Sequence, residues 1–578
     1  MPYDIIIGRG DSDKKKFGKK GLIYLGKGYV KMGNYTSLSN LIWMDIARSH
    51  VVLIAGKRGC LTKDTWVFTD KGYKKIKDFN TKEDKVCSFN KEKKEFEWEN
   101  AELLKYNISN ENLLEIELED GRKLSLTKEH PLMLVTGSSL LSLLWVKATE
   151  LKEGDDLLSI KDSPDNLMPI KIKNIKEING IKEVYDLSVN KNHSFIANGI
   201  ISHNSGKSYS IGVMAEELSC LPKEVSQNIA PLIFDTMGIF WTMKYKNEKD
   251  KELLREWNLA PKNVPVRVFV PYGKFEEYEK SQIPVDEKFA LKASELDEGD
   301  WLLTFGIKFT DPISILIQRS INNLKETKKD FDIENILNKI KETDEKEDTK
   351  KAALALFEAA STWGLFAEKG EKGTAIKDLL EAGKTTVIDT SCYSSIASFN
   401  VRALVIGLVS RKLFIERMDA RKKEEIEAIH NLGIYSERKK MPLVWIFIDE
   451  AHEFLPQNEK TPASDALIQL LREGRQPGIS LVLATQQPGI IHQDVMTQSD
   501  IVISHRVTAQ PDIQALNNIM QTYLMESIRQ QLDDLPDLRG SAIILDDNSE
   551  RIYPVRIRPK FTWHGGEAPV AIKDEKEI

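Results

Sequence analysis

Two half-motifs that lie far apart in the chain constrain its fold more than any other sequence feature. Residues 51–55 (VVLIA) form an apolar, β-branched run typical of a buried strand, and residues 56–59 (GKRG) follow it as a glycine-rich turn. Residues 60–63 (CLTK) then lack the Gly-Lys-Ser that closes a phosphate-binding loop. That ending occurs downstream, as residues 205–208 (SGKS). The sequence therefore predicts one loop that is split into two parts.

Removing the residues between the two parts restores the complete motif. Gly59 joined to Ser205 gives GKRGSGKS, which has the G-x-x-x-x-G-K-S spacing of a phosphate-binding loop. Residues 209–218 (YSIGVMAEEL) follow and predict a helix with an apolar face, formed by Ile211, Met214, Ala215 and Leu218. Two half-motifs can also arise by chance, but chance does not explain the reactive residues at both junctions. The predicted nucleotide-binding residues are Gly56, Lys57, Arg58, Gly59, Ser205, Gly206, Lys207, Ser208 and Tyr209.

The junction residues themselves predict self-excision. The Cys60 thiolate is a strong nucleophile that can attack the Gly59 carbonyl carbon and take the upstream chain as a thioester. The Ser205 hydroxyl can accept that acyl group, and the Asn204 side-chain amide can close on its own carbonyl and release Ser205. An acyl shift from the Ser205 oxygen to its nitrogen then leaves a Gly59–Ser205 peptide bond. Each step exchanges one acyl bond for another, so no cofactor is needed.

The interior of this segment resembles the splicing blocks of inteins, in their expected order. The resemblance rests on residues 60–79 (CLTKDTWVFTDKGYKKIKDF), 126–134 (LTKEHPLML), 184–199 (VYDLSVNKNHSFIANG) and 201–204 (ISHN). It spans residues 60–204 and includes no endonuclease-like acidic motif, as in a mini-intein. The resemblance implies an all-β horseshoe of the Hint type, which suits the many short β-rich runs.

The resemblance also implies roles within these blocks. His130, with Thr127, would polarise the upstream junction peptide and protonate its departing nitrogen. Asp186 would assist both acyl transfers, and His203 with His193 would assist the cyclisation of asparagine. A single histidine is more often structural, but all three histidines of the segment, out of nine in the chain, fall in splicing blocks. The residues implied in splicing are Cys60, Thr127, His130, Asp186, His193, His203, Asn204 and Ser205.

Residues 441–456 (MPLVWIFIDEAHEFLP) carry the next strong motif. The apolar run 444–448 predicts a strand, and Asp449 and Glu450 follow it directly. Together with a phosphate-binding loop, this pattern predicts that Asp449 and Ser208 hold Mg²⁺ and that Glu450 polarises the attacking water. The alternative is an ordinary buried strand with a solvated acidic end.

A further apolar run, residues 479–484, ends in Thr485 and Gln486, and Gln486 is expected to contact the γ-phosphate of ATP. Arg475 precedes this run, at the position where a neighbouring subunit of a ring ATPase presents an arginine to the nucleotide. Arg506, near the end of another strand-like run, is a second candidate. The alternative for Arg475 is a surface side chain paired with a carboxylate.

Several segments of the remaining chain resemble HerA, within the HerA–FtsK class of ring translocases. The most specific pattern is REGRQPG followed by LATQQP, and Asp235 matches an acidic position of the family near the nucleotide. The segments that carry the resemblance are residues 53–59 with 205–210, 231–241, 444–456, 470–488, 499–512 and 535–559.

This resemblance implies an α/β RecA-like P-loop core with a mainly parallel sheet, helices on both faces and a helical insertion. It also implies ATP and Mg²⁺ as ligands, a homo-oligomeric ring of six subunits, double-stranded DNA as the track and a NurA-type nuclease as a partner. Two departures stand out. Only residues 1–44 precede the core, where HerA proteins carry a β-barrel, and Met237 and Ile239 stand where relatives have acidic or histidine residues.

The motifs divide the chain into five parts. Strands are expected in the first part at residues 5–7, 22–25 and 29–32. In chain order the parts are a short β segment (1–44), the start of the ATPase core (45–59), the mini-intein (60–204), the rest of the core with a helical insertion at about 290–370 (205–565), and a tail (566–578).

Composition limits the remaining functions. The formal net charge of −6 argues against a generally sticky nucleic-acid binder without excluding a ring with a basic channel. Cys60, Cys87, Cys220 and Cys392 show no metal-ligand spacing, which suits a reducing compartment. The chain opens with no secretory leader, and no apolar run has the length of a membrane span, so a cytoplasmic location without a membrane is expected.

Three alternatives remain open from the sequence. The host could be a nucleotide-binding scaffold that rarely hydrolyses ATP, although Glu450 argues against this. It could be a related ATPase that moves protein or conjugating DNA at a membrane. The insert could cleave without ligating, although Ser205 and Asn204 together favour ligation.

Overall fold

The computed structural model divides the chain into two compact units. The first is made of the described residues of 1–55, 207–505 and 515–565, and the second includes the described residues of 56–206. The residues that the structure describes are 4–32, 35–56, 61–80, 83–90, 95–107, 113–127, 130–135, 143–148, 151–161, 163–178, 183–189, 194–203, 207–328, 330–367, 371–393, 400–430, 441–505, 514–516, 535–536 and 540–564.

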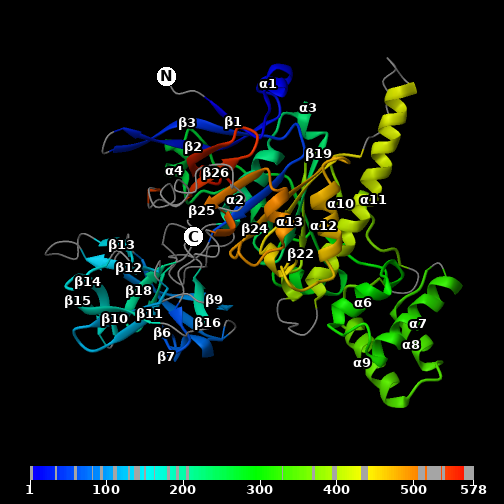
Figure 1. The fold of residues 1–578 in the computed structure, drawn as a ribbon, viewed down its shortest axis with the longest axis horizontal. Coiled ribbons are helices and arrows are strands. Elements are labelled where there is room, and N and C mark those ends of the chain that lie inside the picture. Colours follow the sequence, from blue (N-terminus) through cyan, green and yellow to red (C-terminus); the bar gives the residue numbers. More distant parts are fainter. Residues whose placement is uncertain are drawn as a thin grey trace. The chain divides into compact units, whose positions relative to one another are not determined.

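A sheet of 13 strands forms the centre of the first unit (Figure 1). Its order is β1-β3-β2-β27-β26-β25-β4-β24-β23-β19-β22-β20-β21, and all neighbours from β25 to β21 run parallel. These parallel strands confirm the predicted mainly parallel α/β core. The parallel strands are β25 (Ile501–His505), β4 (Val51–Ala55), β24 (Ile479–Thr485), β23 (Leu443–Ile448), β19 (Ile229–Asp235), β22 (Thr385–Asp389), β20 (Val266–Pro271) and β21 (Glu287–Phe289).

Helices cover both faces of the parallel strands. Val52 and Ile54 of β4 share a buried core with helix α2 (Lys207–Ser219). The four apolar positions predicted for one face of this helix are all buried. Alternate residues of β4, such as Val51 and Leu53, are equally buried, and α12 (Ser464–Glu473) and α13 (Gln493–Gln498) contact β24 and β4. Burial on both faces is why these strands are almost wholly apolar.

Five further strands extend this sheet: β1 (Ile5–Ile7), β2 (Leu22–Met32), β3 (Tyr35–Asp45), β26 (Ser541–Asp546) and β27 (Arg551–Ile557). The two strands expected at residues 22–25 and 29–32 are one strand, β2, so that expectation was wrong in its division. Gly26 lies within β2, and a Cβ there would lie 2.1 Å from the Arg556 carbonyl oxygen. Glycine therefore lets β27 approach, and the register shifts beside it instead of the strand ending.

Four helices within residues 298–361 form the helical insertion: α6 (Glu298–Phe305), α7 (Pro312–Thr327), α8 (Ile333–Lys341) and α9 (Glu347–Ser361) (Figure 1). The buried Trp301 ring of α6 packs on Phe305 of the same helix, on Phe357 of α9 and on Phe366, with ring centroid distances of 5.6, 4.9 and 5.2 Å. The remaining helices of the unit are α1 (Asp11–Phe17), α3 (Lys223–Ser226), α4 (Lys251–Glu256), α5 (Phe275–Lys280), α10 (Ile376–Leu379) and α11 (Val401–His430).

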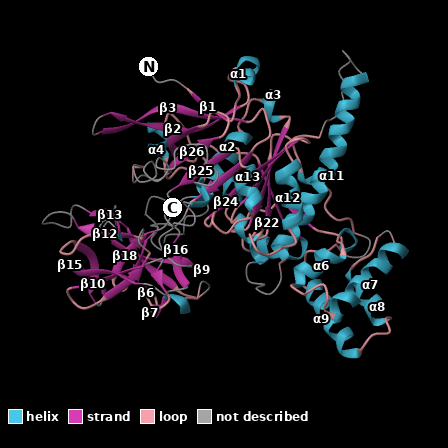
Figure 2. Cartoon of the chain, viewed as in Figure 1, coloured by secondary structure: helices cyan, strands magenta, loops and turns pink. Residues whose placement is uncertain are grey.

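The second unit contains an antiparallel sheet of 14 strands, and strands are its main described secondary structure in Figure 2. The last strand, β18, pairs with β17, β12 and β14, which joins distant parts of the sheet. The strands are β5 (Leu61–Thr62), β6 (Trp66–Thr69), β7 (Gly72–Lys75), β8 (Lys85–Asn90), β9 (Glu95–Asn107), β10 (Leu113–Leu118), β11 (Lys123–Leu126), β12 (Pro131–Val135), β13 (Leu143–Lys147), β14 (Asp156–Lys161), β15 (Ser163–Ile178), β16 (Glu183–Val189), β17 (Ser194–Ala197) and β18 (Ile200–His203).

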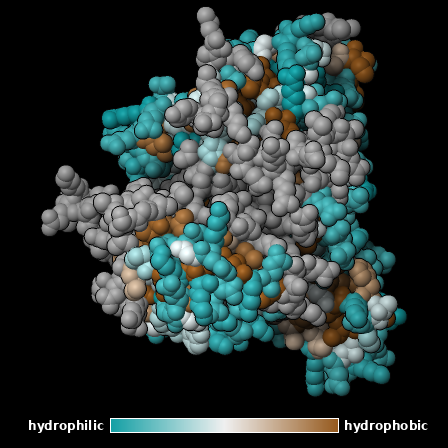
Figure 3. Space-filling model, turned by 60° about the vertical axis from the view of Figure 1, so that its left-hand side comes forward, coloured by the Kyte–Doolittle hydropathy of each residue, from teal (hydrophilic) through white to brown (hydrophobic). Residues whose placement is uncertain are grey.

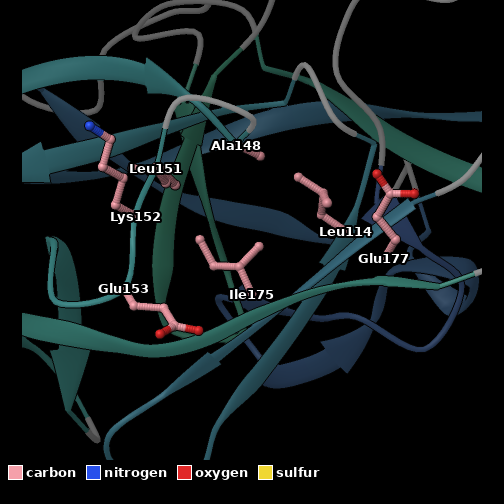
Figure 4. A pocket seen from close by; sticks show the side chains of 7 residues that line it. All are labelled: Leu114, Ala148, Leu151, Lys152, Glu153, Ile175 and Glu177. Atoms are coloured by element: carbon pink, nitrogen blue, oxygen red, sulfur yellow. The ribbon is translucent and has the colours of Figure 1, made fainter.

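The described surface is mainly hydrophilic in the space-filling view, with smaller hydrophobic areas (Figure 3). A pocket of the second unit lies between β10, β15, Ala148 and residues 151–153, and none of the described residues that line it is a predicted splicing residue (Figure 4). None of the described helices combines the length and the continuous apolar surface that crossing a bilayer requires.

Candidate functional site

The ends of neighbouring parallel strands bring the predicted ATPase residues to one edge of the large sheet. β4, β24, β23 and β19 are consecutive parallel neighbours, so their carboxyl ends meet at the same edge. Gly56 follows β4, Asp449 follows β23, Gln486 follows β24, and Asp235 ends β19. The structure therefore gathers residues from four distant segments at the edge where open α/β sheets bind ligands.

The two elements that flank the split loop already contact each other in the uncut chain. β4 ends at Ala55, α2 begins at Lys207, and α2 packs on β4, β24 and β19 within the first unit. The loop itself lies outside the described residues, as do the side chains of Lys207 and Ser208. The predicted contacts of the loop with nucleotide thus remain predictions, while its flanks are in place.

Glu450 and Gln486 contact each other at this edge. The Gln486 side-chain amide donates a hydrogen bond to a carboxylate oxygen of Glu450. Glu450 has a left-handed backbone with φ of 50°, and its N–H donates to Asp449 Oδ1 at 2.9 Å. The other carboxylate oxygen of Glu450, Oε2, is buried and has no hydrogen-bond partner among the described residues. The site therefore offers one free carboxylate oxygen, which is what a general base requires.

His452 is a further side chain of this site that the motif did not single out. Its Nδ1 lies 3.2 Å from Thr485 Oγ1 and 3.6 Å from Glu450 Oε2. The only sequence signal for His452 is its position two residues after Glu450.

Two buried carboxyl groups lie side by side further along the same edge. Asp235 and Asp389 end β19 and β22 and are register partners. The backbone N–H groups of Met237, Gly238 and Phe240 donate to the Asp235 carboxylate at 3.1, 2.7 and 2.7 Å. Burial, followed by the charge of Asp389, nonetheless raises the pKa of Asp235 to about 7. The sequence motifs pointed to Asp235 but not to Asp389. Asp389 could have been found because it also follows an apolar run and precedes a threonine, as Asp235 does.

Arg475 lies at the opposite, amino edge of the sheet, before β24. Its Nη2 donates to the Gln498 carbonyl oxygen at 2.6 Å and lies 3.5 Å from Asp500 Oδ1. Within one subunit the structure does not bring Arg475 to Glu450 and Gln486, and it supplies the carboxylate partner that the surface alternative expects. Arg506 lies outside the described residues.

A buried charged network begins at the same amino edge. His50 Nδ1 lies 2.5 Å from Asp500 Oδ2, His50 Nε2 lies 3.4 Å from Asp45 Oδ2, and Arg9 Nε donates to Asp45 Oδ1 at 2.8 Å. Burial opposes a charged ring, but the hydrogen bonds that the ring donates to the carboxylates of Asp45 and Asp500 raise the pKa of His50 to about 9. Asp500 also accepts from the Val51 N–H at 2.7 Å. The network thus holds the start of the strand that leads to the split loop.

Tyr209, predicted to bind nucleotide, contacts the end of the host chain. Its hydroxyl accepts from the Lys560 N–H at 2.7 Å, and its ring meets the His564 ring edge-on at a centroid distance of 5.2 Å. Burial raises the pKa of Tyr209 above its ordinary range. In the uncut chain this side chain anchors residues 560–564 to α2, and its contact with nucleotide remains a prediction.

The upstream junction leads into a strand between two predicted splicing residues. Leu61, the first residue of β5, pairs antiparallel with Leu126 of β11 and Tyr185 of β16. Thr127 directly follows β11 and Asp186 lies within β16, and each is the residue after a partner of Leu61. Cys60 and the side chain of Asp186 lie outside the described residues, and their roles remain predictions.

The downstream junction adjoins the same block of residues. β12 begins directly after His130 and pairs antiparallel with β18 at Leu132 and Ser202. β18 ends at His203, so this register brings the end of β18 toward His130. The backbone N–H of His130 donates to the Thr127 carbonyl oxygen at 3.0 Å. Thr127 and His130 thus connect both junctions. The structure does not describe His193, Asn204, Ser205 or the side chain of His203.

Profiles of two protein families match the host part of the chain. The central domain of the helicase HerA matches residues 205–412, and zonular occludens toxin (Zot) matches residues 374–510. The HerA match begins at Ser205, the residue that follows the predicted insert.

Curated relatives match shorter stretches. The DNA double-strand break repair helicase HerA of Pyrococcus furiosus is 27% identical over 143 residues, which are 24% of this chain and 24% of the relative. The probable HerA of Methanocaldococcus jannaschii is 31% identical over 119 residues, which are 18% and 24%. The probable helicase MJ1565 of the same organism is 26% identical over 346 residues, which are 56% and 60%. The chain therefore spans between about a quarter and 60% of the length of these relatives.

Solved inteins are similar to part of the chain. An intein from a hyperthermophile is 22% identical with a TM-score of 0.23, covering 25% of this chain and 99% of that one. The DnaX mini-intein from Spirulina platensis is 25% identical with a TM-score of 0.22 and the same two shares. The part of the chain that follows the predicted insert is therefore similar to the central domain of HerA. Its parallel sheet forms one unit, and residues 56–206 lie in a separate antiparallel unit.

Proposed function

We propose that the chain is a precursor whose residues 60–204 excise themselves and join Gly59 to Ser205. The joined host would hydrolyse ATP as a ring of six subunits and move along double-stranded DNA. One observation carries this proposal: β4 and α2, which flank the split loop, pack together in one compact unit, while the residues between them form another. An insert with its own sheet can leave without removing any strand or helix of the host.

The proposed splicing steps balance without a cofactor. The Cys60 sulfur would bond to the Gly59 carbonyl carbon, and the Cys60 nitrogen would leave with a proton donated by His130. The Ser205 oxygen then displaces the sulfur. Asn204 cyclises and releases the Ser205 nitrogen, to which the acyl group finally moves. The strand pairing that connects both junctions to Thr127 and His130 supports one shared reaction site.

The proposed ATP site uses the carboxyl edge of the large sheet. The phosphates would lie on the loop amides and the N-terminus of α2, with Lys207 on the β- and γ-oxygens. Asp449, buried at the end of β23, suits Mg²⁺ because its carboxylate offers hard oxygen ligands, and Ser208 would complete that site. The ion would neutralise charge on the phosphates. The free Oε2 of Glu450 supports this residue as the base for the attacking water.

The partners follow from relatives. The name of the Pyrococcus furiosus relative, a DNA double-strand break repair helicase, supports DNA as the track. In a ring, Arg475 would act on the nucleotide of the neighbouring subunit, which fits its place away from its own Glu450. A NurA-type nuclease is the proposed partner and the cytoplasm the proposed location.

Intact-mass analysis of the expressed chain tests the proposal. We expect a host that lacks residues 60–204, together with the separate excised domain, whereas a Cys60→Ala, Asn204→Ala double variant should stay full-length. DNA-stimulated phosphate release should be at least about a hundredfold lower in that variant, because the amides and lysine that stabilise phosphate charge are not joined. Equal turnover in both proteins would contradict the dependence on splicing, and separate fragments without ligated host would show cleavage alone.

A further inference from the structure

Arg122 ties together three parts of the intein-like domain, although no motif singles it out. Its Nε donates to Asp120 Oδ2 at 2.7 Å, and its Nη2 donates to Ser159 Oγ at 2.7 Å. Its Nη1 donates to two carbonyl oxygens, those of Ile160 at 3.1 Å and Asn198 at 3.2 Å. Only 29% of the side chain is exposed, so these hydrogen bonds are largely shielded from water. A guanidinium suits this task because its donors point in several fixed directions.

Asn198 and Gly199 form the two-residue turn that joins β17 to β18. Both have positive φ, 47° and 82°, as the tight turns of hairpins often require. The Asn198 side chain accepts from the Trp66 N–H at 2.6 Å and donates to the Lys123 carbonyl at 2.5 Å. A Cβ on Gly199 would lie 1.9 Å from Arg122 Nη1, so the guanidinium fills the space that glycine leaves open. The position of the Arg122 guanidinium therefore requires glycine at the second residue of this turn.

The turn matters because β18 leads directly to the downstream junction. This strand has four residues and ends at His203, next to Asn204. A slip of one residue would send each side chain of β18 to the other face of the sheet and move the junction along it. In a hairpin this short the turn sets the register. Arg122 thus acts on the junction through the Asn198 carbonyl.

We propose that Arg122 is a positioning residue for the cyclisation of Asn204. In this step the Asn204 Nδ2 forms a bond to its own carbonyl carbon, the bond to the Ser205 nitrogen breaks, and a proton passes from Nδ2 to that nitrogen. Arg122 takes no part in these bonds. It holds the hairpin in the register from which the attacking nitrogen meets the carbonyl carbon. The inference rests on the splicing function proposed above.

Two reporter variants of the full-length chain measure the reactions at the two junctions separately. With Cys60→Ala, only Asn204 can release the downstream host, and with Asn204→Ala, added thiol cleaves only the thioester at Cys60. Arg122→Gln should slow the first reaction by about tenfold to a hundredfold, the effect expected for a misplaced reacting group, and leave the second nearly unchanged. Ser159→Ala removes one partner of the guanidinium and should give a smaller loss with the same selectivity.

Two further variants complete this test. Arg122→Lys keeps the charge but not the fork of donors, and should restore part of the downstream rate. Lys173→Gln is the matched control, because this side chain is 60% exposed and forms a surface ion pair with Glu117 at 2.7 Å. It should leave both rates unchanged.

The outcomes distinguish the inference from the function on which it rests. Equal losses at both junctions, or unchanged rates at both, in Arg122→Gln and Ser159→Ala would overturn the positioning role while splicing stands. Absence of cleavage in both reporters that otherwise carry the native sequence would overturn the splicing function, and the positioning role with it.

Discussion

The two units build their candidate sites from opposite strand arrangements. In the first unit, parallel strands bring Asp235, Glu450 and Gln486, which are far apart in the chain, to one edge of the sheet. In the second, antiparallel pairing brings the two ends of the segment, β5 and β18, to the strands around Thr127 and His130. The ATPase site therefore needs the host sheet as a whole, whereas the splicing site needs only short pairs within its own unit. Under the proposed function, this difference would allow the insert to act before the host site is complete.

The comparison also limits what splicing can change in the host. β4 and α2 contact each other in the uncut chain, and the described part of the parallel sheet is already formed. Ligation would therefore complete a loop between two elements that are in place. The expected dependence of ATP hydrolysis on splicing concerns the loop and its amides, and not the fold of the core.

The largest expected effect is that of a Glu450 substitution, which should affect ATP hydrolysis by the host but not splicing. Glu450→Gln should lower phosphate release by the spliced host by about 10²- to 10⁴-fold, the usual contribution of a general base, without changing the splicing yield. Both are measured on one preparation, by phosphate release and intact mass. Glu453→Gln is the matched control, because Glu453 is 40% exposed and pairs with Arg402 at 2.9 Å. Undiminished phosphate release in Glu450→Gln would favour a nucleotide-binding scaffold.

A core substitution tests whether the stabilities of the units are independent. Trp301→Ala should lower the free energy of unfolding of the spliced host by about 3–5 kcal/mol, because the buried ring contacts three other aromatic rings of the helical insertion. Denaturant unfolding measures this change, and the splicing rate at low temperature should not change. A splicing rate that falls with host stability would contradict independent units.

The His50 network predicts a pH dependence confined to the host. Because folding raises the pKa of His50 to about 9 from an unfolded value near 6.5, its stabilisation is complete below pH 6.5 and is lost as the pH rises through 9. The loss should be on the order of 2–3 kcal/mol. Unfolding of the spliced host between pH 6 and pH 10 measures it. His50→Gln should flatten this profile and His430→Gln should not, so equal slopes in the native host and His50→Gln would exclude the network as the cause.

The smallest expected effect concerns the contact between Gln486 and Glu450. Gln486→Ala should lower phosphate release by about tenfold, since it removes a hydrogen bond to a charged group and the proposed γ-phosphate contact. Gln487→Ala is the control, because Gln487 contacts Thr485 Oγ1 at 3.0 Å through its backbone N–H, which the substitution keeps. Faster phosphate release in Gln486→Ala would mean that Gln486 restrains Glu450 instead of assisting it.

Much of the fold was predictable where local pattern decides it. The strands at residues 51–55, 444–448 and 479–484 are apolar runs followed by polar or glycine residues, and the structure confirms each within one residue. The continuity of β2 across Gly26 was not predictable. A glycine can end a strand, but it can also let a neighbouring strand approach closely, as Gly26 does here. The edge on which Arg475 lies also follows only from strand order, which no local pattern states.

The split loop, the nucleophiles at its two junctions and the acidic end of β23 are predictions that need only the sequence, because they are residue types at set spacings along the chain. Three contacts are visible only in the folded chain: Asp389 lies beside Asp235, Gln486 reaches Glu450, and Arg122 holds the turn before the downstream junction. These contacts join segments that are distant in the chain. They depend on strand order and register, which are set by the packing of the whole sheet and not by the preference of any single segment.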